Sequence, residues 1–139
     1  MKKVSDIMSL NLVTLSPEHL CYHAMLKMHE NFLRHIPVVD PDGNLIGVVS
    51  DRDVKQQLTD NLNIEDANQS EMEWMLRPLA DIMSKAPITV YPDENISKVV
   101  ELFLNHRISS VIVLPRDSQK PAGILTETDL LQMLHNFLQ

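Results

Sequence analysis

The sequence predicts an α/β fold built from two pseudo-symmetric repeats. Each repeat has the element order β-α-β-β-α, and the two are expected to pack face to face through their sheets. One observation is a short stretch that occurs twice, Gly-Val-Val-Ser-Asp-Arg-Asp at residues 47–53 and Gly-Ile-Leu-Thr-Glu-Thr-Asp at residues 123–129. A second is that the motifs around both copies recur in the same order. One copy alone would bury its sheet face poorly, so the repeat predicts two packed units.

The duplicated stretch predicts a buried strand that runs directly into a helix. Its apolar pair is typical of a strand end, and Ser50 or Thr126 then stands where a helix N-cap is expected. A helix N-terminus offers free backbone N–H groups and a favourable dipole to an anion. The geometry would suit a phosphate on the hydroxyl and a sugar diol on the aspartate that follows, Asp53 or Asp129.

The first repeat is expected to open with a short strand at residues 12–15. A helix should start at Ser16, as its cap, with Pro17 in the first helical position, and should end near Asn31. Its apolar face is predicted from residues at helical spacing: Cys21, Ala24, Met25, Met28 and Phe32. A buried strand at 35–39, with Pro37 at an edge or bulge, a turn at 40–43 and an antiparallel return at 45–49 should follow. The helix after Ser50 would carry Val54 and Leu58.

Residues 59–69 are polar and acidic and predict a connector, followed by a capping box at residues 70–73. A short helix through Trp74, Met75 and Leu76 should stop before Pro78, with Trp74 anchoring it on the domain. The second repeat then echoes the first at an offset of 75 residues, from Asp6-Ile7-Met8-Ser9 to Asp81-Ile82-Met83-Ser84. At the glycines the offset becomes 76, which places an inserted residue in the loop at 115–121. The predicted organisation is repeat 1 at 1–58, a connector at 59–78 and repeat 2 at 79–139.

Net charge, apolar runs and cysteine content argue against several classes of protein. The 139 residues carry a net charge of −7, which argues against non-specific nucleic-acid binding because such binding relies on basic surface. The apolar runs are too short to span a bilayer, and no signal peptide is expected at the first residues. Cys21 is the single cysteine, so no internal disulfide can form, and a reducing, cytoplasmic location is expected.

The repeat resembles a tandem pair of CBS domains, also called a Bateman module, over nearly the whole chain. The resemblance rests on Asp6-Ile7-Met8, on Asp81-Ile82-Met83, on residues 34–40 and on the two duplicated stretches. Ser50-Asp51-Arg52-Asp53 resembles the form in the CBS pair of IMP dehydrogenases. The connector is similar to that of small stand-alone CBS proteins of the acetoin-utilisation type.

This resemblance implies a regulatory binding module that is not an enzyme and needs no catalytic cofactor. Tandem CBS domains bind AMP, ADP, ATP, S-adenosylmethionine or NAD in clefts between the halves, and binding is expected to reposition one half against the other. In the family pattern the aspartate holds the ribose hydroxyls and the Ser or Thr approaches the phosphate. The base lies against strand backbone and apolar side chains.

The first expected site comprises Thr14, Arg34, His35, Ile36, Pro37, Ser50, Arg52 and Asp53. The second comprises Thr89, His106, Arg107, Val111, Ile112, Thr126 and Asp129. Because Ser109 replaces Arg34 in the second repeat, phosphate binding is expected less strongly there.

The family also implies a homodimer formed through the helices that follow the strands, here with Val54, Leu58, Leu130, Leu131 and Leu134. The signal would pass through that dimer or to an effector protein.

Other interpretations remain open. Ser50 with Asp53, and Thr126 with Asp129, could be helix caps alone, and the chain would then be a ligand-free dimeric adaptor. His19 and His23 have a spacing that can hold a metal, as a metal-dependent enzyme would require, but Cys21 points to another face and nothing else supplies further ligands. No nucleophile–base set can be argued from spacing. Cys21 itself is interpreted as an inert core thiol.

Overall fold

The computed structural model describes residues 2–60 and 73–139, with the side chains of all of them except 58–60. The chain forms two compact units. The contiguous unit comprises Val13–Ala86, and the split unit comprises Met1–Leu12 together with Pro87–Gln139. Each repeat begins with an opening motif, at residues 4–9 in the first repeat and residues 79–84 in the second. The boundaries of the two units differ from those of the sequence repeats, because each opening motif lies in the unit built from the other repeat.

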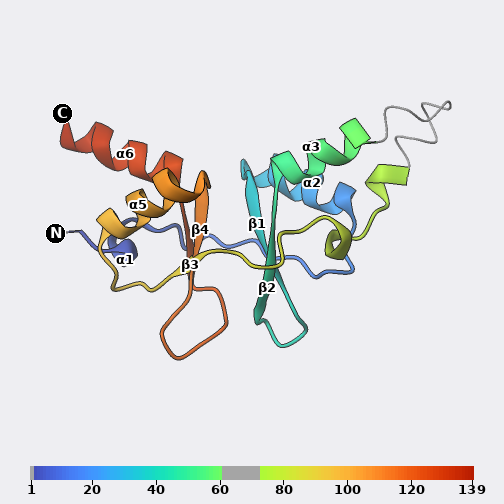
Figure 1. The fold of residues 1–139 in the computed structure, drawn as a ribbon, viewed down its shortest axis with the longest axis horizontal. Helices are drawn as coiled ribbons and strands as arrows, with labels where there is room; N and C mark the ends of the chain where they lie inside the picture. Colours follow the sequence, from blue (N-terminus) through green and yellow to red (C-terminus); the bar gives the residue numbers. More distant parts are fainter. Residues whose placement is uncertain (1, 61–72) are drawn as a thin grey trace. The chain divides into compact units, whose positions relative to one another are not determined.

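The contiguous unit is organised around an antiparallel hairpin. Strands β1 (His35–Val39) and β2 (Leu45–Ser50) pair with His35 opposite Ser50. The turn forms as predicted: Asp40 accepts backbone N–H bonds through its side chain, and Gly43 takes the positive φ of 88° that glycine tolerates. Helices α2 (Cys21–Asn31) and α3 (Asp51–Asp60) pack against one another (Figure 1). Pro37 lies in β1 at the edge of this two-stranded sheet, one residue before the register shift between Val38 and Val39.

The prediction that the first helix starts at Ser16–Pro17 was wrong. Helix α2 begins at Cys21, and residues 17–18 form a turn. The backbone of residues 19–21 instead forms long-range hydrogen bonds. The Cys21 N–H donates to the Arg77 carbonyl at 2.8 Å, and the Leu79 N–H donates to the His19 carbonyl at 2.8 Å. The expected strand at 12–15 is reduced to one parallel bridge, between Leu15 and Val38.

The chain after α3 returns to the core of the contiguous unit. Residues 73–75 are helical, as predicted, whereas the capping box expected to start this helix lies outside the described residues. Trp74 is buried and packs in the same core as Ile36, Val49 and Val54, so the predicted anchoring by Trp74 is confirmed. A 3-10 turn, η1 (Leu79–Asp81), then buries Leu79 completely in this core.

The split unit contains a three-stranded sheet in the order β3-β4-β5. Strand β3 (Thr89–Val90) is parallel to β4 (Ser110–Val113), which is antiparallel to β5 (Gly123–Thr126). Helices α1 (Val4–Ile7), α5 (Ile96–His106) and α6 (Glu127–Phe137) complete it (Figure 1). Its core collects residues from both ends of the chain: Val4, Val90, Ile96, Val99, Phe103, Val111, Val113 and Leu125.

The two glycines of the duplicated stretch explain how the opening motifs are held. Ser84 exchanges two backbone hydrogen bonds with Val48 in the contiguous unit, and Ser9 exchanges two with Ile124 in the split unit. A Cβ at Gly47 would come within 2.6 Å of the Met83 sulfur and 2.8 Å of the Ser84 carbonyl oxygen. A Cβ at Gly123 would meet Met8 and Ser9 in the same way, at 2.7 and 3.0 Å. Glycine is therefore needed for this close approach of backbones.

The predicted apolar faces of the long helices are only partly correct. Cys21, Ala24 and Met28 are buried, but Met25 is exposed, and so is its counterpart Val100 in α5. Phe32 lies beyond the end of α2 with a left-handed φ of 56°, and its side chain is 95% exposed. The left-handed residue ends the helix and turns the Phe32 side chain away from the face on which helical spacing would place it.

Candidate ligand sites at two strand-to-helix junctions

The junction between β2 and α3 is held by reciprocal hydrogen bonds. The Ser50 Oγ accepts from the Asp53 backbone N–H at 3.1 Å, and the Asp53 Oδ2 accepts from the Ser50 N–H at 2.8 Å. Ser50 is thus the N-cap, as predicted, and Asp53 supplies the returning arm of a capping box. Both side chains are half-buried, so they are fixed in place yet accessible.

The junction between β5 and α6 repeats this geometry. The Asp129 Oδ2 accepts from the Thr126 N–H at 2.8 Å, and the Thr126 Oγ1 accepts from the Asp129 N–H at 3.4 Å. The Thr126 hydroxyl also donates to Asp129 Oδ2 at 3.1 Å. The two junctions therefore present the same pair of groups, with the hydroxyl in the split unit engaged more closely by its aspartate.

The structure brings the other predicted residues of the first site to the same hairpin. His35 lies opposite Ser50 across the strands, and the Arg34 carbonyl accepts the Asp51 N–H at 2.9 Å. Thr14 directly precedes Leu15, whose N–H donates to the Pro37 carbonyl at 3.1 Å. The side chains of Ile36 and Pro37 are fully buried, so in this conformation they offer a ligand mainly backbone atoms. Arg52 is exposed in the first turn of α3.

The predicted residues of the second site are brought together less completely. Thr89 pairs with Ile112, Val111 pairs with Leu125, and Ser110 lies opposite Thr126. The side chains of Val111 and Ile112 are buried. His106 and Arg107 lie exposed at the end of α5, with Arg107 in the left-handed region at φ 53°, and the contacts that hold Thr126 and Asp129 do not involve them.

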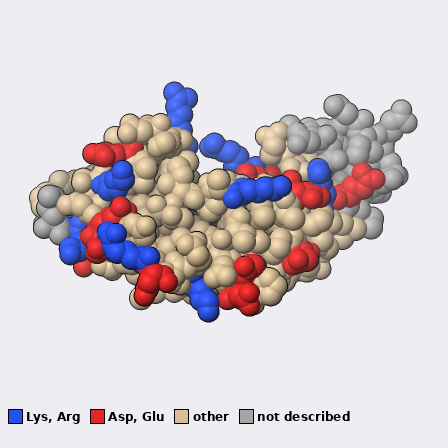
Figure 2. All heavy atoms as spheres, turned by 60° about the horizontal axis from the view of Figure 1, so that its bottom comes forward, with Lys and Arg blue, Asp and Glu red and all other residues tan. Residues whose placement is uncertain are grey.

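Charge distinguishes the two junctions. Arg34 and Arg52 flank the first, whereas Ser109 and Thr128 occupy the matching positions of the second. On the face drawn in Figure 2, the Lys and Arg side chains of the described residues are interspersed with Asp and Glu side chains. On that face, a cation that assists an anionic ligand would therefore act as an individual side chain and not as part of a broad basic surface.

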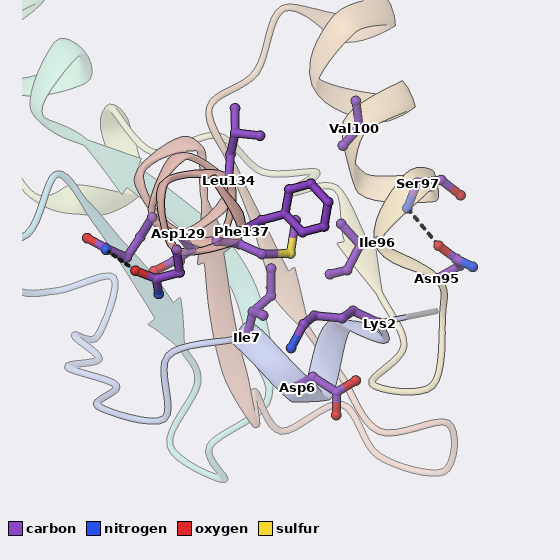
Figure 3. A pocket seen from close by; sticks show the side chains of 13 residues that line it. Lys2, Asp6, Ile7, Asn95, Ile96, Ser97, Val100, Asp129, Leu134 and Phe137 are labelled. Atoms are coloured by element: carbon purple, nitrogen blue, oxygen red, sulfur yellow. Dashed lines mark hydrogen bonds between the residues drawn. The ribbon is translucent and has the colours of Figure 1, made fainter. Parts of the chain in front are cut away.

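A wide groove of about 990 Å³ lies in the split unit, between α1, α5 and α6. Figure 3 shows Phe137 of α6 and Ile7 of α1 pointing toward Ile96 of α5. Lys2 and Asp6 lie at its rim, and Asp129 reaches it from the start of α6. Phe137 is 83% exposed and Leu131, earlier in α6, is 65% exposed, so α6 presents apolar side chains to its surroundings.

The residues weighed for other chemistry have structural partners. Burial raises the pKa of the Cys21 thiol, with Arg77 partly opposing this effect, and a buried thiol with a raised pKa is a poor nucleophile. The Nδ1 atoms of His19 and His23 accept backbone N–H bonds from Ser16 and Leu20. Within residues 2–60 and 73–139, no group of three or more His, Cys, Asp or Glu side chains could hold a metal ion.

Sequence reasoning missed two features of the sites. It did not predict what the two opening motifs pack against. A usable signal was that a methionine recurs in both motifs, as Met8 and Met83, while a glycine recurs in both duplicated stretches. It also missed the groove of the split unit, because Lys2, Asp6 and Ile7 are far from α5 and α6 in sequence.

Comparison with known proteins agrees with this architecture. The family model of the CBS domain matches residues 4–60 and 79–136. A CBS domain-containing protein of Dictyostelium discoideum is 32% identical over 139 residues, which covers 98% of this chain and 93% of the relative. The chain is a tandem repeat protein and belongs to the CBS domain family.

Solved structures show the same fold. One, from Vibrio cholerae, is of a protein assigned as the acetoin utilization protein AcuB; it has a TM-score of 0.80 and 26% identity, covering 99% of this chain and 93% of the other. The CBS domain pair of protein MJ0100, in complex with 5′-methylthioadenosine and S-adenosyl-L-methionine, has a TM-score of 0.84 at 23% identity, with 99% and 98% covered. CBSX2 in complex with AMP has a TM-score of 0.81 at 23% identity, with 100% of each chain covered. No helix among the described residues is long and apolar enough to cross a bilayer.

Proposed function

We propose that this protein is a regulatory module that binds an adenosine-containing ligand at the strand-to-helix junctions and is not itself an enzyme. The main observation in favour of this proposal is that the same pair of a hydroxyl and a carboxylate, fixed by reciprocal hydrogen bonds, occurs at two junctions of one chain. A capping pair that occurs once has an ordinary structural explanation. Its recurrence beside exposed helix N-termini, in a fold shared with proteins solved with AMP and with S-adenosyl-L-methionine, supports ligand binding.

In this proposal each group has a distinct role. The bonds to the backbone use Oδ2 of Asp53 and Asp129, and Oδ1 of each carboxylate would accept from a ribose hydroxyl. The N–H groups of Asp51, Asp53, Glu127 and Asp129 already have acceptors in the protein. The second backbone N–H of each helix, that of Arg52 in α3 and of Thr128 in α6, would therefore face the phosphate or its substitute, as helix N-termini favour anions. Backbone beside Thr14 in the contiguous unit and beside Thr89 in the split unit would receive the adenine edge.

The difference in charge predicts which junction takes a phosphate. Arg34 and Arg52 can each form charge-assisted hydrogen bonds to phosphate oxygens, and the matching Ser109 and Thr128 cannot. The junction of the contiguous unit is therefore proposed for AMP, ADP or ATP. The junction of the split unit is proposed for an adenosyl compound with little negative charge, with His106 and Arg107 as its nearest candidate cations.

In this proposal the ligand signal leaves the module through a contact with another protein chain. A ligand shifts a conformational equilibrium only by its differential affinity for the two states. We propose that α6 forms part of a homodimer surface, because Leu131, Leu134 and Phe137 are exposed together on it. Leu130 is half-buried against the core of the split unit, and Val54 is buried in the contiguous unit, so neither would contribute much area; Leu58 lies outside the described side chains.

The direct test is thermal unfolding with AMP, ATP, S-adenosylmethionine and NAD. A ligand at about 100 times its dissociation constant should stabilise the fold by about 2.7 kcal/mol, a shift of several degrees. Asp53→Ala should abolish the shift given by AMP, whereas Asp129→Ala should retain it. Because the shift is measured within each variant, the loss of the cap itself cancels. Asp51→Ala, which changes the neighbouring half-buried carboxylate, is the matched control and should keep the full shift.

No shift with any adenine compound in the wild-type protein would leave the two aspartates as helix caps and favour a ligand-free adaptor. The dimer is tested separately by sedimentation of Leu131→Asp and Leu134→Asp variants. A dimer that survives both substitutions would exclude this face of α6.

A further inference from the structure

The start of helix α2 is held by two imidazoles. The His19 Nδ1 accepts from the Ser16 backbone N–H at 2.9 Å, and the His23 Nδ1 accepts from the Leu20 N–H at 3.0 Å. Leu20 is the N-cap residue and has no side chain that can accept a hydrogen bond. His23 therefore takes the part of the third helical residue in a capping box, which accepts from the N-cap N–H, and His19 closes the turn that leads into the helix.

The split unit has a carboxylate and an amide as acceptors at the start of its equivalent helix, α5. At the position of His19 it has Glu94, whose Oε2 accepts from the Tyr91 N–H at 3.0 Å. At the position of Leu20 it has Asn95, whose side chain accepts from the Ser97 N–H at 2.9 Å. Lys98 stands at the position of His23. The helix starts are otherwise equivalent, so the histidines are a chemical replacement at a fixed backbone geometry.

Protonation removes what these histidines supply. A backbone N–H can only donate, so each Nδ1 must carry a lone pair, and an imidazolium has none. Histidine is the side chain that ordinarily changes charge between pH 5 and 8. The two rings are in edge contact, with centroids 5.2 Å apart, at the positive end of a helix dipole. A second proton would therefore add like-charge repulsion to the loss of both acceptors.

The two histidine bonds stabilise residues 16–21, and the end of the connector binds to this same segment. Residues 16–21 hold residues 77–80 through the Arg77 carbonyl and through the N–H groups of Leu79 and Ala80. Leu20 and Pro78 also form an isolated bridge. The connector residues lead directly into Leu79, which is completely buried in the core of the contiguous unit.

Charged groups of both signs surround the pair. Tyr22 stacks at 4.1 Å on the His23 ring. The titratable and charged side chains on the same segment and on the elements packed against it are Glu18, Lys27, His35, Asp51, Arg52, Asp53, Lys55, Arg77 and Asp81. Arg77 and Asp81, which lie on the connector side, carry opposite charges.

We propose that His19 and His23 form a pH-sensitive cap, which holds connector residues 77–80 at neutral pH and releases them on acidification. The device acts on the contiguous unit only. It is independent of the ligand sites proposed above, so it would link acidification to the connector whether or not an adenosyl compound is bound.

The test is amide hydrogen exchange of the full chain at about pH 7.5 and about pH 5.5, expressed as protection factors so that the intrinsic effect of pH cancels. Protection of residues 15–24 and 77–82 should fall on acidification by roughly fivefold or more, the size expected for a lost helix cap. Residues 90–99 of the split unit should keep their protection and serve as the internal control.

Two sets of variants sharpen the result. His19→Glu with His23→Asp replaces both imidazoles by carboxylates that accept at both pH values, and should remove the pH dependence. Glu94→His should create one at residues 90–99. His29→Gln, which changes another exposed histidine of α2, should leave the wild-type response in place. Equal protection of residues 15–24 at the two pH values in the wild-type protein would overturn the proposal, as would a response that persists in the carboxylate double variant.

Discussion

The contiguous unit and the split unit share one frame and differ in the polar groups placed on it. Both have a glycine against a methionine of an opening motif, and both have a hydroxyl–aspartate capping pair. At matched positions, however, Arg34 becomes Ser109, Arg52 becomes Thr128 and His19 becomes Glu94. The frame depends on close backbone approach and on caps, which tolerate few residue types. The positions around it are free to carry different charges, so the two units can respond to different chemical signals.

The largest expected effect tests whether both opening motifs are equally well anchored. Leu79→Ala should lower the free energy of unfolding by about 2–5 kcal/mol, because it leaves a cavity at a completely buried position. Val4→Ala, at the matching position of the split unit, removes less volume and should cost less, about 1.5 kcal/mol at roughly 0.8 per buried carbon. Urea unfolding measures both, with Leu10→Ala at an exposed site as the control. If Leu79→Ala lowers the free energy of unfolding no more than Leu10→Ala does, Leu79 does not anchor its opening motif in the core.

A smaller effect is expected from adding one carbon at each glycine. Gly47→Ala and Gly123→Ala should each destabilise by about 1–3 kcal/mol, since the new Cβ meets a backbone oxygen that cannot easily move. Gly47→Ala should cost more, because its nearest backbone oxygen is at 2.8 Å and that of Gly123 is at 3.0 Å. Ser84→Ala is the matched control, as only the backbone of Ser84 pairs with Val48. A neutral Gly47→Ala in urea unfolding would contradict the close approach.

Removing the caps should cost about 1 kcal/mol in each unit. Thr126→Ala should cost somewhat more than Ser50→Ala, because the Thr126 hydroxyl makes two hydrogen bonds to Asp129, at 3.1 and 3.4 Å, whereas the Ser50 hydroxyl makes one to Asp53, at 3.1 Å. The readout is the midpoint of unfolding, and Thr128→Ala, an exposed hydroxyl one turn away, should have no effect. A larger cost for Ser50→Ala would reverse the ranking of the two junctions.

The smallest effect concerns an ion pair found in the split unit. Arg116 donates to Asp93 at 3.1 Å and lies 4.2 Å from the centroid of the Tyr91 ring. The hydrogen bond from Arg116 lowers the pKa of Asp93 below 3.8. The stabilisation is therefore present above the ordinary pKa and is lost as the pH falls through the lowered one. Because the pair is exposed, Arg116→Ala should leave the unfolding midpoint at neutral pH nearly unchanged.

The sharper readout for that variant is a carboxyl NMR titration, in which the pKa of Asp93 should rise toward 3.8 when Arg116 is removed. Lys120→Ala, an exposed cation in the neighbouring loop, is the control and should not move it. An unchanged titration of Asp93 in Arg116→Ala would show that the pair does not persist in solution.

Local patterns were sufficient to predict the hairpin of the contiguous unit and the caps of both units. The turn at residues 40–43 and the cap at Ser50 depend on residues a few positions apart, and both formed as predicted. The start of α2 was wrong because long-range bonds to Arg77 and Leu79 outcompete the local signal of Ser16 and Pro17. The residues of the two ligand sites remain predictions, since sequence can bring a hydroxyl and an aspartate together in one turn but cannot orient His106 or Arg107.

The exchange of opening motifs has a consequence for the order in which the chain can assemble during synthesis. The contiguous unit is one uninterrupted segment and can close once residue 86 has left the ribosome. The split unit needs both chain ends, because Ser9 pairs with Ile124. Residues 4–9 must therefore wait until residue 124 has emerged, and this late long-range closure carries the entropic cost of a loop of more than 100 residues. Synthesis therefore lets the contiguous unit fold early and the split unit fold late, although the two units have nearly the same design.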